Sequence, residues 1–197
     1  MDMRVKKSGF TLVELLVVIS IIALLMGILT PALASARRSA YKTACKQNLH
    51  GCAIGFRMYM DDNRNYMPKI YNMPNSTVPD DVNSVSLYAA LGKYISGKEA
   101  LKCPADRYPE KGTSYWKEEG SSYEYNTHLN NKRLEDDWFA QRFGTKEVWI
   151  LKDYDGFHGK KGGREEGMGG RAGSSYSVGS FMYLYADTLV GDRKREK

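Results

Sequence analysis

The sequence predicts an α+β fold, in which a long N-terminal helix precedes a small head that contains an antiparallel sheet. Apolar character in the 197-residue chain is concentrated in residues 10–29, and a helical pattern continues to about residue 62. Short strand-like runs occur only in the second half of the chain. Helix first and strands later are typical of an α+β arrangement with the sheet packed on the helix.

The composition is that of a globular protein. Hydrophobic residues make up 42% of the chain and charged residues 26%, which argues against disorder along the whole chain, a collagen and a polytopic membrane protein. The length fits one domain of ordinary size, or a small domain with an appendage.

Residues 10–29 are long enough to cross a membrane as a helix. Only Thr11, Glu14 and Ser20 are clearly polar there, and twenty helical residues span about 30 Å, the thickness of a bilayer core. Residues 1–9 carry three cations and one anion, which favours a cytoplasmic N-terminus.

Three interpretations of this segment compete. The apolar run is longer than the roughly 7–15 residues of a secretory signal peptide, although residues 32–34, Ala-Leu-Ala, are compatible with a cleavage site. A plain signal anchor explains the length and the charge but gives no reason for Glu14, since a carboxylate near the bilayer interior costs about 2.5–3.5 kcal/mol. The third interpretation does explain Glu14.

Residues 7–14, KSGFTLVE, resemble the processing site of type IV pilins and type II secretion pseudopilins. The resemblance implies that a prepilin peptidase cuts after Gly9 and that Phe10 becomes the N-methylated first residue. It also implies that Glu14, the fifth mature residue, guides assembly. Pro31 falls at mature position 22, where this family commonly has a proline.

The chemistry of this motif is consistent with assembly. A cut after Gly9 would free an α-amine on Phe10 that is mostly cationic at neutral pH. A cation and a carboxylate in a low dielectric each need a partner. We therefore expect Glu14 of one subunit to meet the amine of the next subunit in a staggered stack.

A second helical stretch is predicted over residues 31–62. Pro31 lacks a backbone donor and is expected to kink or locally open the helix, with an ordinary helix boundary as the alternative. Beyond it, apolar residues recur at spacings of mostly three and four, and we interpret this stripe as the face on which the head packs. The stripe consists of Leu33, Ala36, Ala40, Ala44, Leu49, Cys52, Phe56, Tyr59 and Met60.

Further elements look like a large bacterial group of pseudopilin-like proteins. They are C-x-x-N-L at residues 45–49, Y-x-x-D-N at residues 59–63 and C-P-x-D at residues 103–106. That group often ends in His-Gly followed later by Ala-Asp-Gly-x-Val. This chain has His158-Gly159 and then Ala186-Asp187, but Thr188 replaces the glycine, which puts any turn or site attached to that motif in doubt.

The three cysteines are Cys45, Cys52 and Cys103. A head outside the cytoplasmic membrane would lie in an oxidising space, and an odd number leaves one thiol outside an intramolecular disulfide. The resemblance makes Cys45 and Cys103 the preferred pair because both lie in family-like elements; a Cys52–Cys103 bond is the alternative. Cys52 faces the helix stripe and is interpreted as a small buried hydrophobe. Without histidines at a suitable spacing the cysteines make a poor zinc site, so no metal ligand is predicted.

Residues 63–197 are expected to form the head. Residues 66–86 are interpreted as a loop, and a short helix and three strands follow. The helix is expected over residues 86–95, and the strands over residues 122–126, 148–151 and 180–186. The Gly-rich residues 156–173 do not fit a phosphate-binding loop, because no strand precedes them and no Gly-Lys-Ser/Thr follows them. They are interpreted as a mobile loop inserted between two strands.

The residues do not suggest catalysis. The three histidines are scattered and no serine has a Gly-x-Ser-x-Gly context, so we predict neither an enzyme nor a cofactor. Some family members bind calcium in the head; calcium stays an open expectation without assigned ligands, since no acidic cluster has EF-hand spacing. Removal of residues 1–9 lowers the net charge from +6 to +4, and the dispersed remainder predicts no nucleic-acid partner.

The sequence therefore predicts a pilin-like structural subunit. Its segments are a leader (1–9), a transmembrane and assembly helix (10–30), an amphipathic helix (31–62) and the head (63–197). The protein is expected to be a single-pass protein of the inner (cytoplasmic) membrane, with a cytoplasmic N-terminus and a periplasmic head, that enters a filament after assembly.

The expected partners are prepilin peptidase, other copies or related pilins in a helical filament, and an inner-membrane assembly platform. The sequence favours a type II secretion pseudopilus. A type IV pilus subunit, major or minor, is the close alternative, and a membrane-anchored binding module that never polymerises is a different class.

Overall fold

The computed structural model describes residues 11–70, 85–106, 112–154, 157–158 and 182–191. The chain divides into two compact units, Met1–Ser39 (the N-terminal unit) and Ala40–Lys197 (the head unit). Gly9 and Phe10, at the predicted cleavage site, lie outside the described residues. So does all of the predicted Gly-rich loop except its positions 157 and 158.

The long helix α1 spans Leu12–Asp62. Pro31 lies inside it and not at its end, so the alternative of a helix boundary at this proline is wrong, while the kink stays a prediction. The polar side chains of the apolar half are satisfied locally, which suits a helix in lipid. The Ser20 hydroxyl donates to the Leu16 carbonyl at 2.8 Å, and the Thr30 hydroxyl donates to the Met26 carbonyl at 2.7 Å.

The part of α1 in the head unit buries one face at helical spacing. The buried positions are Cys45, Leu49, Cys52, Ala53, Gly55, Phe56 and Met60. The predicted stripe is wrong in its first part, because Leu33, Ala36, Ala40 and Ala44 are exposed. The buried face begins at Cys45, one position after Ala44. Cys45 lies four residues before Leu49 and seven residues before Cys52, so the three side chains lie on the same face of the helix.

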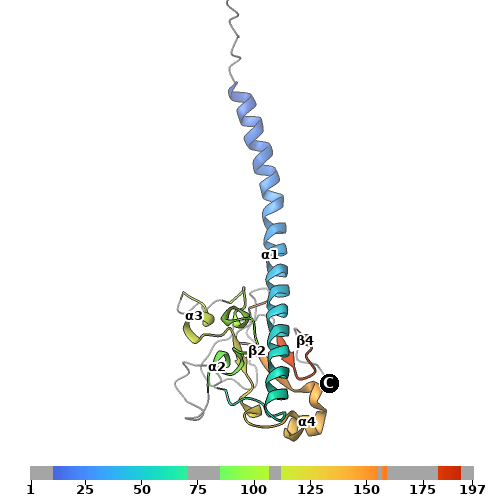
Figure 1. Ribbon diagram of the computed structural model, residues 1–197. Coiled ribbons are helices and arrows are strands. Elements are labelled where there is room, and N and C mark those ends of the chain that lie inside the picture. The colour runs from blue at the N-terminus through green and yellow to red at the C-terminus, as the bar shows by residue number, and fades with distance from the viewer. Residues whose placement is uncertain (1–10, 71–84, 107–111, 155–156, 159–181, 192–197) are drawn as a thin grey trace, which may run out of the picture. The chain divides into compact units, whose positions relative to one another are not determined.

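The sheet of the head has four antiparallel strands in the order β1-β2-β3-β4. They are β1 (Tyr123–Tyr125), β2 (Trp149–Asp153), β3 (Tyr183–Tyr185) and β4 (Val190–Gly191). The labelled strands β2 and β4 lie beside the C-terminal part of α1 (Figure 1). This arrangement confirms the predicted α+β class; β4 had no counterpart among the predicted strands.

Short helices complete the described head. The predicted helix at residues 86–95 is shorter than expected: α2 spans Leu87–Leu91, with the Ser86 hydroxyl accepting from the Ala89 N–H. Two further helices, α3 (Tyr115–Glu119) and α4 (Trp138–Phe143), were not predicted. The 3₁₀ turns are η1 (Lys98–Leu101), η2 (Thr127–Leu129), η3 (Leu134–Asp136) and η4 (Thr145–Glu147).

Tyrosines of the central sheet belong to the core. Tyr123 and Tyr125 are each 1% exposed, and the ring of Tyr125 stacks on Phe56 of α1 with 5.8 Å between centroids. The Tyr125 hydroxyl donates to the Pro68 carbonyl at 3.1 Å, which satisfies its polar end. These tyrosines therefore join the sheet to the helix.

Candidate functional site

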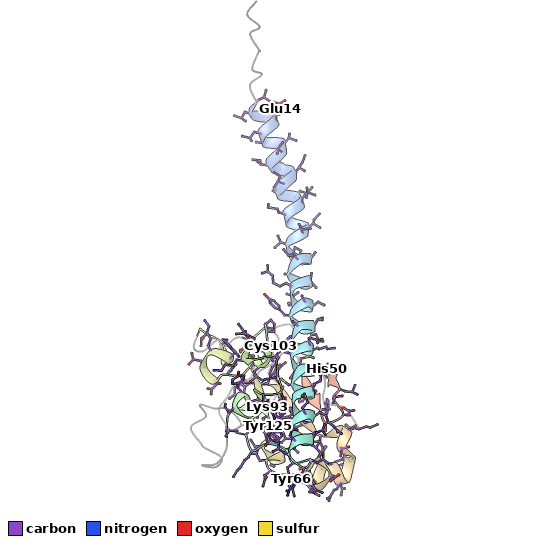
Figure 2. All side chains as sticks on the ribbon, in the orientation of Figure 1. Glu14, His50, Tyr66, Lys93, Cys103 and Tyr125 are labelled. Carbon is purple, nitrogen blue, oxygen red and sulfur yellow. The ribbon has the colours of Figure 1, made fainter. Side chains whose placement is uncertain are left out.

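Glu14 is held by the first turn of its own helix. Its Oε2 atom accepts from the Thr11 N–H at 2.8 Å and from the Thr11 hydroxyl at 2.7 Å, while the Glu14 N–H donates to the Thr11 hydroxyl oxygen at 3.3 Å. These reciprocal bonds form a capping box. Figure 2 shows Glu14 at the N-terminal end of α1. This role of Thr11 was not predicted, although the Thr-x-x-Glu spacing of residues 11–14 indicates it.

The helix after Glu14 presents apolar side chains on all sides. From Leu12 to Leu29 its large hydrophobic residues are between 45% and 79% exposed. In the part of the chain that the structure describes, α1 is the one helix whose length and apolar composition suffice to cross a membrane. An isolated chain leaves this surface without a covering, so lipid or other helices must provide it.

The C-x-x-N-L and Y-x-x-D-N elements attach α1 to the head. The Asn48 amide donates to the Lys102 carbonyl at 2.7 Å. At the end of α1, Asp62 accepts from the Tyr94 hydroxyl at 2.8 Å and from Lys93 Nζ at 3.1 Å. The hydrogen bond from Tyr94, followed by the interactions with Lys93, lowers the pKa of Asp62. Both elements therefore have a structural role.

Asp106 of the C-P-x-D element organises the start of α3. Its two oxygens accept from the backbone N–H groups of Tyr115 at 3.0 Å and Trp116 at 2.8 Å. Its Oδ2 atom also accepts from the Ser122 hydroxyl at 2.6 Å. The Ser122 oxygen in turn accepts from the Cys103 N–H at 2.9 Å, so this network positions Cys103.

Four buried side chains with metal-binding chemistry converge inside the head unit. They are Cys45 on α1, Cys103 after η1, Asp153 at the end of β2 and His158, and their ligand atoms all lie within 4.8 Å of one another. Cys45 Sγ lies 3.5 Å from Asp153 Oδ1, and Cys103 Sγ lies 3.3 Å from His158 Nε2. His158 Nε2 lies 3.6 Å from Asp153 Oδ2.

Comparison with known proteins places the chain in a family. The family model for the prokaryotic N-terminal methylation motif matches residues 4–30. The chain is also similar to the type IV wide pilus major component PilA4 of Thermus thermophilus. The two are 45% identical over 110 residues, which cover 53% of this chain and 84% of that protein. The chain belongs to the type IV pilin-like family. No solved structure matches it.

In this pilin-like protein burial and hydrogen bonding both act on the charge states of the buried cluster. Burial raises the pKa of Asp153 well above its ordinary value and lowers the pKa of His158 to about 4. A hydrogen bond with Cys103, together with burial, raises the pKa of Cys45. Burial also raises the pKa of Tyr123, whose hydroxyl lies 3.3 Å from Cys45 Sγ. The neutral forms of these groups are therefore favoured.

The structure brings Cys45 and Cys103 into one cluster and leaves Cys52 outside it. Cys52 is buried against the Ala100 carbonyl, with 3.8 Å between sulfur and oxygen, which confirms its interpretation as a buried residue of the helix face. All three cysteines are free thiols in the structure. The Cys45–Cys103 disulfide thus stays a prediction.

Asp153 and His158 are the members of the cluster that sequence reasoning missed as ligands. His158 belonged to a family-like element, His158-Gly159, but the spacing of residues offered no reason to join it to either cysteine. Asp153 belongs to one of the acidic clusters that lack EF-hand spacing, with Asp155 as its neighbour. Pairing of β2 with β1 and β3 places it.

The turn of the Ala-Asp-Gly element survives without its glycine. Thr188 has φ of +67°, its N–H donates to the Tyr185 carbonyl at 2.9 Å, and the Tyr185 N–H donates to the Leu189 carbonyl at 2.9 Å. Asp187 Oδ1 accepts from the Leu189 N–H at 3.2 Å. The turn therefore forms even though Thr188 replaces the glycine of the family-like element.

Proposed function

We propose that this pilin is a membrane-anchored subunit of a pilus-like filament that assembles through the first half of α1. The observation that carries the proposal is the exposed apolar surface from Leu12 to Leu29 with one ionisable residue, Glu14, at its start. A helix that only anchored a monomer would gain from an apolar residue at this position. A subunit that must align with a neighbour gains a charge partner there.

Processing supplies the partner charge. In this proposal prepilin peptidase cuts after Gly9 at the cytoplasmic face of the inner membrane, and the new amine on Phe10 is methylated. Both hydrogen bonds from Thr11 end on Oε2 of Glu14, and a carboxylate has further acceptor sites. The capping box can therefore persist while Glu14 receives the amine of a neighbouring subunit.

The orientation follows from the charges of the leader. The cations of residues 1–9 favour retention of the N-terminus in the cytoplasm, which places the head in the periplasm before assembly. An inner-membrane assembly platform would then extract the subunit. In this proposal the head has no role in catalysis. It forms the outer surface of the filament around the packed N-terminal helices.

The class of filament is proposed from the similar protein of known function. PilA4 is described as the major component of a type IV wide pilus, which supports a type IV pilus over the type II secretion pseudopilus that the sequence alone favoured. The pseudopilus remains the second candidate, because the C-x-x-N-L and C-P-x-D elements resemble pseudopilin-like proteins.

The N-terminal peptide of the chain from its own host's membranes tests the processing step. We expect a chain that begins at N-methylated Phe10. Cells without prepilin peptidase serve as the control and should contain a chain heavier by residues 1–9 and lighter by the methyl group. A chain that still begins at Met1 or Met3 in normal cells would contradict the proposal and leave a membrane-anchored binding module as the better interpretation.

Filaments sheared from the cell surface test the class. A type IV pilus predicts that mass spectrometry detects this chain in the sheared fraction and that deletion of its gene removes those filaments. A pseudopilus predicts that the chain stays in the cell envelope and that deletion blocks secretion of proteins into the medium.

A further inference from the structure

The cluster of Cys45, Cys103, Asp153 and His158 brings together four side chains of the types that bind transition metals. All four are buried, with exposed fractions of 0%, 1%, 0% and 6%. They come from four separate places in the head unit: the helix, the segment after η1, the end of β2 and the short segment beyond it. Packing of the whole head is thus needed to bring them together.

Two of the separations between these atoms match the edges of a tetrahedral zinc site. Bonds of about 2.3 Å to sulfur and about 2.0–2.2 Å to nitrogen or oxygen place neighbouring ligand atoms about 3.3–3.8 Å apart. Two pairs lie in this range, with 3.5 Å between Cys45 Sγ and Asp153 Oδ1 and 3.3 Å between Cys103 Sγ and His158 Nε2. All four ligand atoms lie within 4.8 Å of one another, so an ion at the centre would draw the wider pairs together by at most about 1.5 Å.

The surrounding groups orient the ligands as a second shell does. The Met182 N–H donates to Asp153 Oδ2 at 2.8 Å, which turns Oδ1 toward Cys45. The Tyr123 hydroxyl lies 3.3 Å from Cys45 Sγ and can donate to a thiolate. The Cys103 backbone is held by Ser122 at 2.9 Å. Such outer hydrogen bonds are characteristic of metal sites.

A disulfide between the same two cysteines accounts for less of this arrangement. It would use both sulfur atoms and give no reason for a carboxylate and an imidazole to be buried beside them, away from water. A divalent cation compensates the desolvation of all four groups together. Two thiolates and one carboxylate leave a single excess negative charge around it.

We propose that Cys45, Cys103, Asp153 and His158 bind one zinc ion that stabilises the pilin head. Two thiolates with one imidazole and one carboxylate suit tetrahedral zinc. Four protein ligands leave no open position, so the site is structural and not catalytic. The ion would join α1 to the sheet at the place where the buried helix face begins.

Metal analysis of the full-length chain, purified in detergent with its thiols reduced, tests the proposal. We expect about one zinc ion per chain and a lower melting temperature after chelation. Cys103→Ser and His158→Ala should lose the zinc. Cys52→Ser is the matched control and should keep the zinc. Cys52 is as buried as Cys45 and Cys103 but lies outside the cluster.

Two measurements separate loss of a ligand from loss of the fold. His158→Cys replaces the imidazole by another zinc ligand and should restore zinc binding that His158→Ala removes. Cobalt added to the metal-free wild-type chain should give the visible absorption of a tetrahedral ion and a thiolate charge-transfer band, both removed by one equivalent of zinc. Reduced wild-type chain that binds neither metal would overturn the proposal. So would a chain from native membranes that is lighter by two hydrogens with a Cys45–Cys103 linked peptide.

Discussion

Thr188 adopts a left-handed backbone conformation, with φ of +67°, that β-branched residues rarely accept. The turn that it forms between β3 and β4 is closed by hydrogen bonds between Tyr185 and Leu189 and between Thr188 and Tyr185. The neighbouring Asp187 side chain reinforces it. The residue is thus held in place by its surroundings at a local conformational cost.

Replacement of this residue should stabilise the head. Thr188→Gly is expected to raise the free energy of unfolding by about 1 kcal/mol, because glycine adopts positive φ without steric cost. Urea unfolding of the detergent-solubilised chain, followed by near-ultraviolet circular dichroism, measures the change. Thr188→Ala is the control and should gain less, since it removes the β-branch but keeps a Cβ. A loss of stability with glycine would show that the conformation is not strained.

Helix α1 contains two glycines in the head unit whose surroundings differ. A Cβ on Gly55 would lie 2.6 Å from Ile95 Cγ2, whereas a Cβ on Gly51 would meet nothing within 4 Å. Gly55 therefore permits a close approach between the helix and the segment that follows α2. Gly51 only weakens the helix, since glycine is about 1 kcal/mol less favourable than alanine there.

The pair of alanine substitutions should have effects of opposite sign. Gly51→Ala is expected to raise the free energy of unfolding by about 0.5–1 kcal/mol. Gly55→Ala is expected to lower it by about 1–3 kcal/mol, because Ile95 must move within a packed core. Thermal unfolding of the two variants under the same detergent conditions compares them directly. Equal gains in the free energy of unfolding for both variants would mean that Ile95 does not lie close to Gly55.

The contact of Asp62, at the end of α1, with Lys93 and Tyr94 makes the stability of the folded head depend on pH. The hydrogen bond from Tyr94 is the main reason why the pKa of Asp62 is lowered in the folded chain. Stability from this contact is therefore present above the pKa of Asp62 in the unfolded chain and is lost as the pH falls through its lower folded value.

Asp62→Asn should accordingly reduce the loss of stability on acidification. The expected effect is small because the pair is exposed to solvent. Melting temperatures of both chains, measured between about pH 2 and pH 6, should converge at the acid end and differ most at the neutral end. Asp61→Asn is the neighbouring control, whose partner is Arg57 on the same helix. Parallel curves for wild type and Asp62→Asn would contradict this assignment.

The molecule as a whole combines two units with different requirements. The apolar residues of α1 in the N-terminal unit need lipid or other helices around them, whereas the head unit has its own core of helix and sheet. Glu14 belongs to the first unit and is unfavourable for insertion alone. Its presence is explained by assembly, as proposed above, and not by anchoring.

Glu14→Leu separates anchoring from assembly in the intact protein. Membrane insertion should become more favourable, by less than the roughly 2.5–3.5 kcal/mol that a charge costs at the helix centre, because Glu14 lies in the first turn of α1. The amount of chain in the membrane fraction should therefore not fall. Filament formation should fail, because the amine of the neighbouring subunit loses its partner. Immunoblots of membrane and sheared-filament fractions measure both effects, with Ser20→Ala as a control that leaves the charge unchanged. Normal filaments with Glu14→Leu would exclude the proposed contact between Glu14 and the amine of the neighbouring subunit.

Local patterns in the sequence determined the family, the long helix and most of the sheet. The motif of residues 7–14 and the apolar run after it depend on neighbours along the chain, as do the capping box of Thr11 and the alternation in β1. Such features can be recognised without knowledge of the fold, because they arise from helical or strand periodicity. For the same reason the limits of the buried helix face were predicted poorly. Exposure of Ala44 and burial of Cys45 depend on what packs against them.

Only the tertiary structure decided which distant side chains meet. Cys45, Cys103, Asp153 and His158 lie on separate segments, and no spacing in the sequence relates the cysteines to the other two residues. The register of β2 between its neighbours places Asp153, and packing of the sheet on α1 brings Cys45 to it. Sequence reasoning dismissed a zinc site because it considered local spacing, whereas this site is assembled from groups that become neighbours only when the head closes its core.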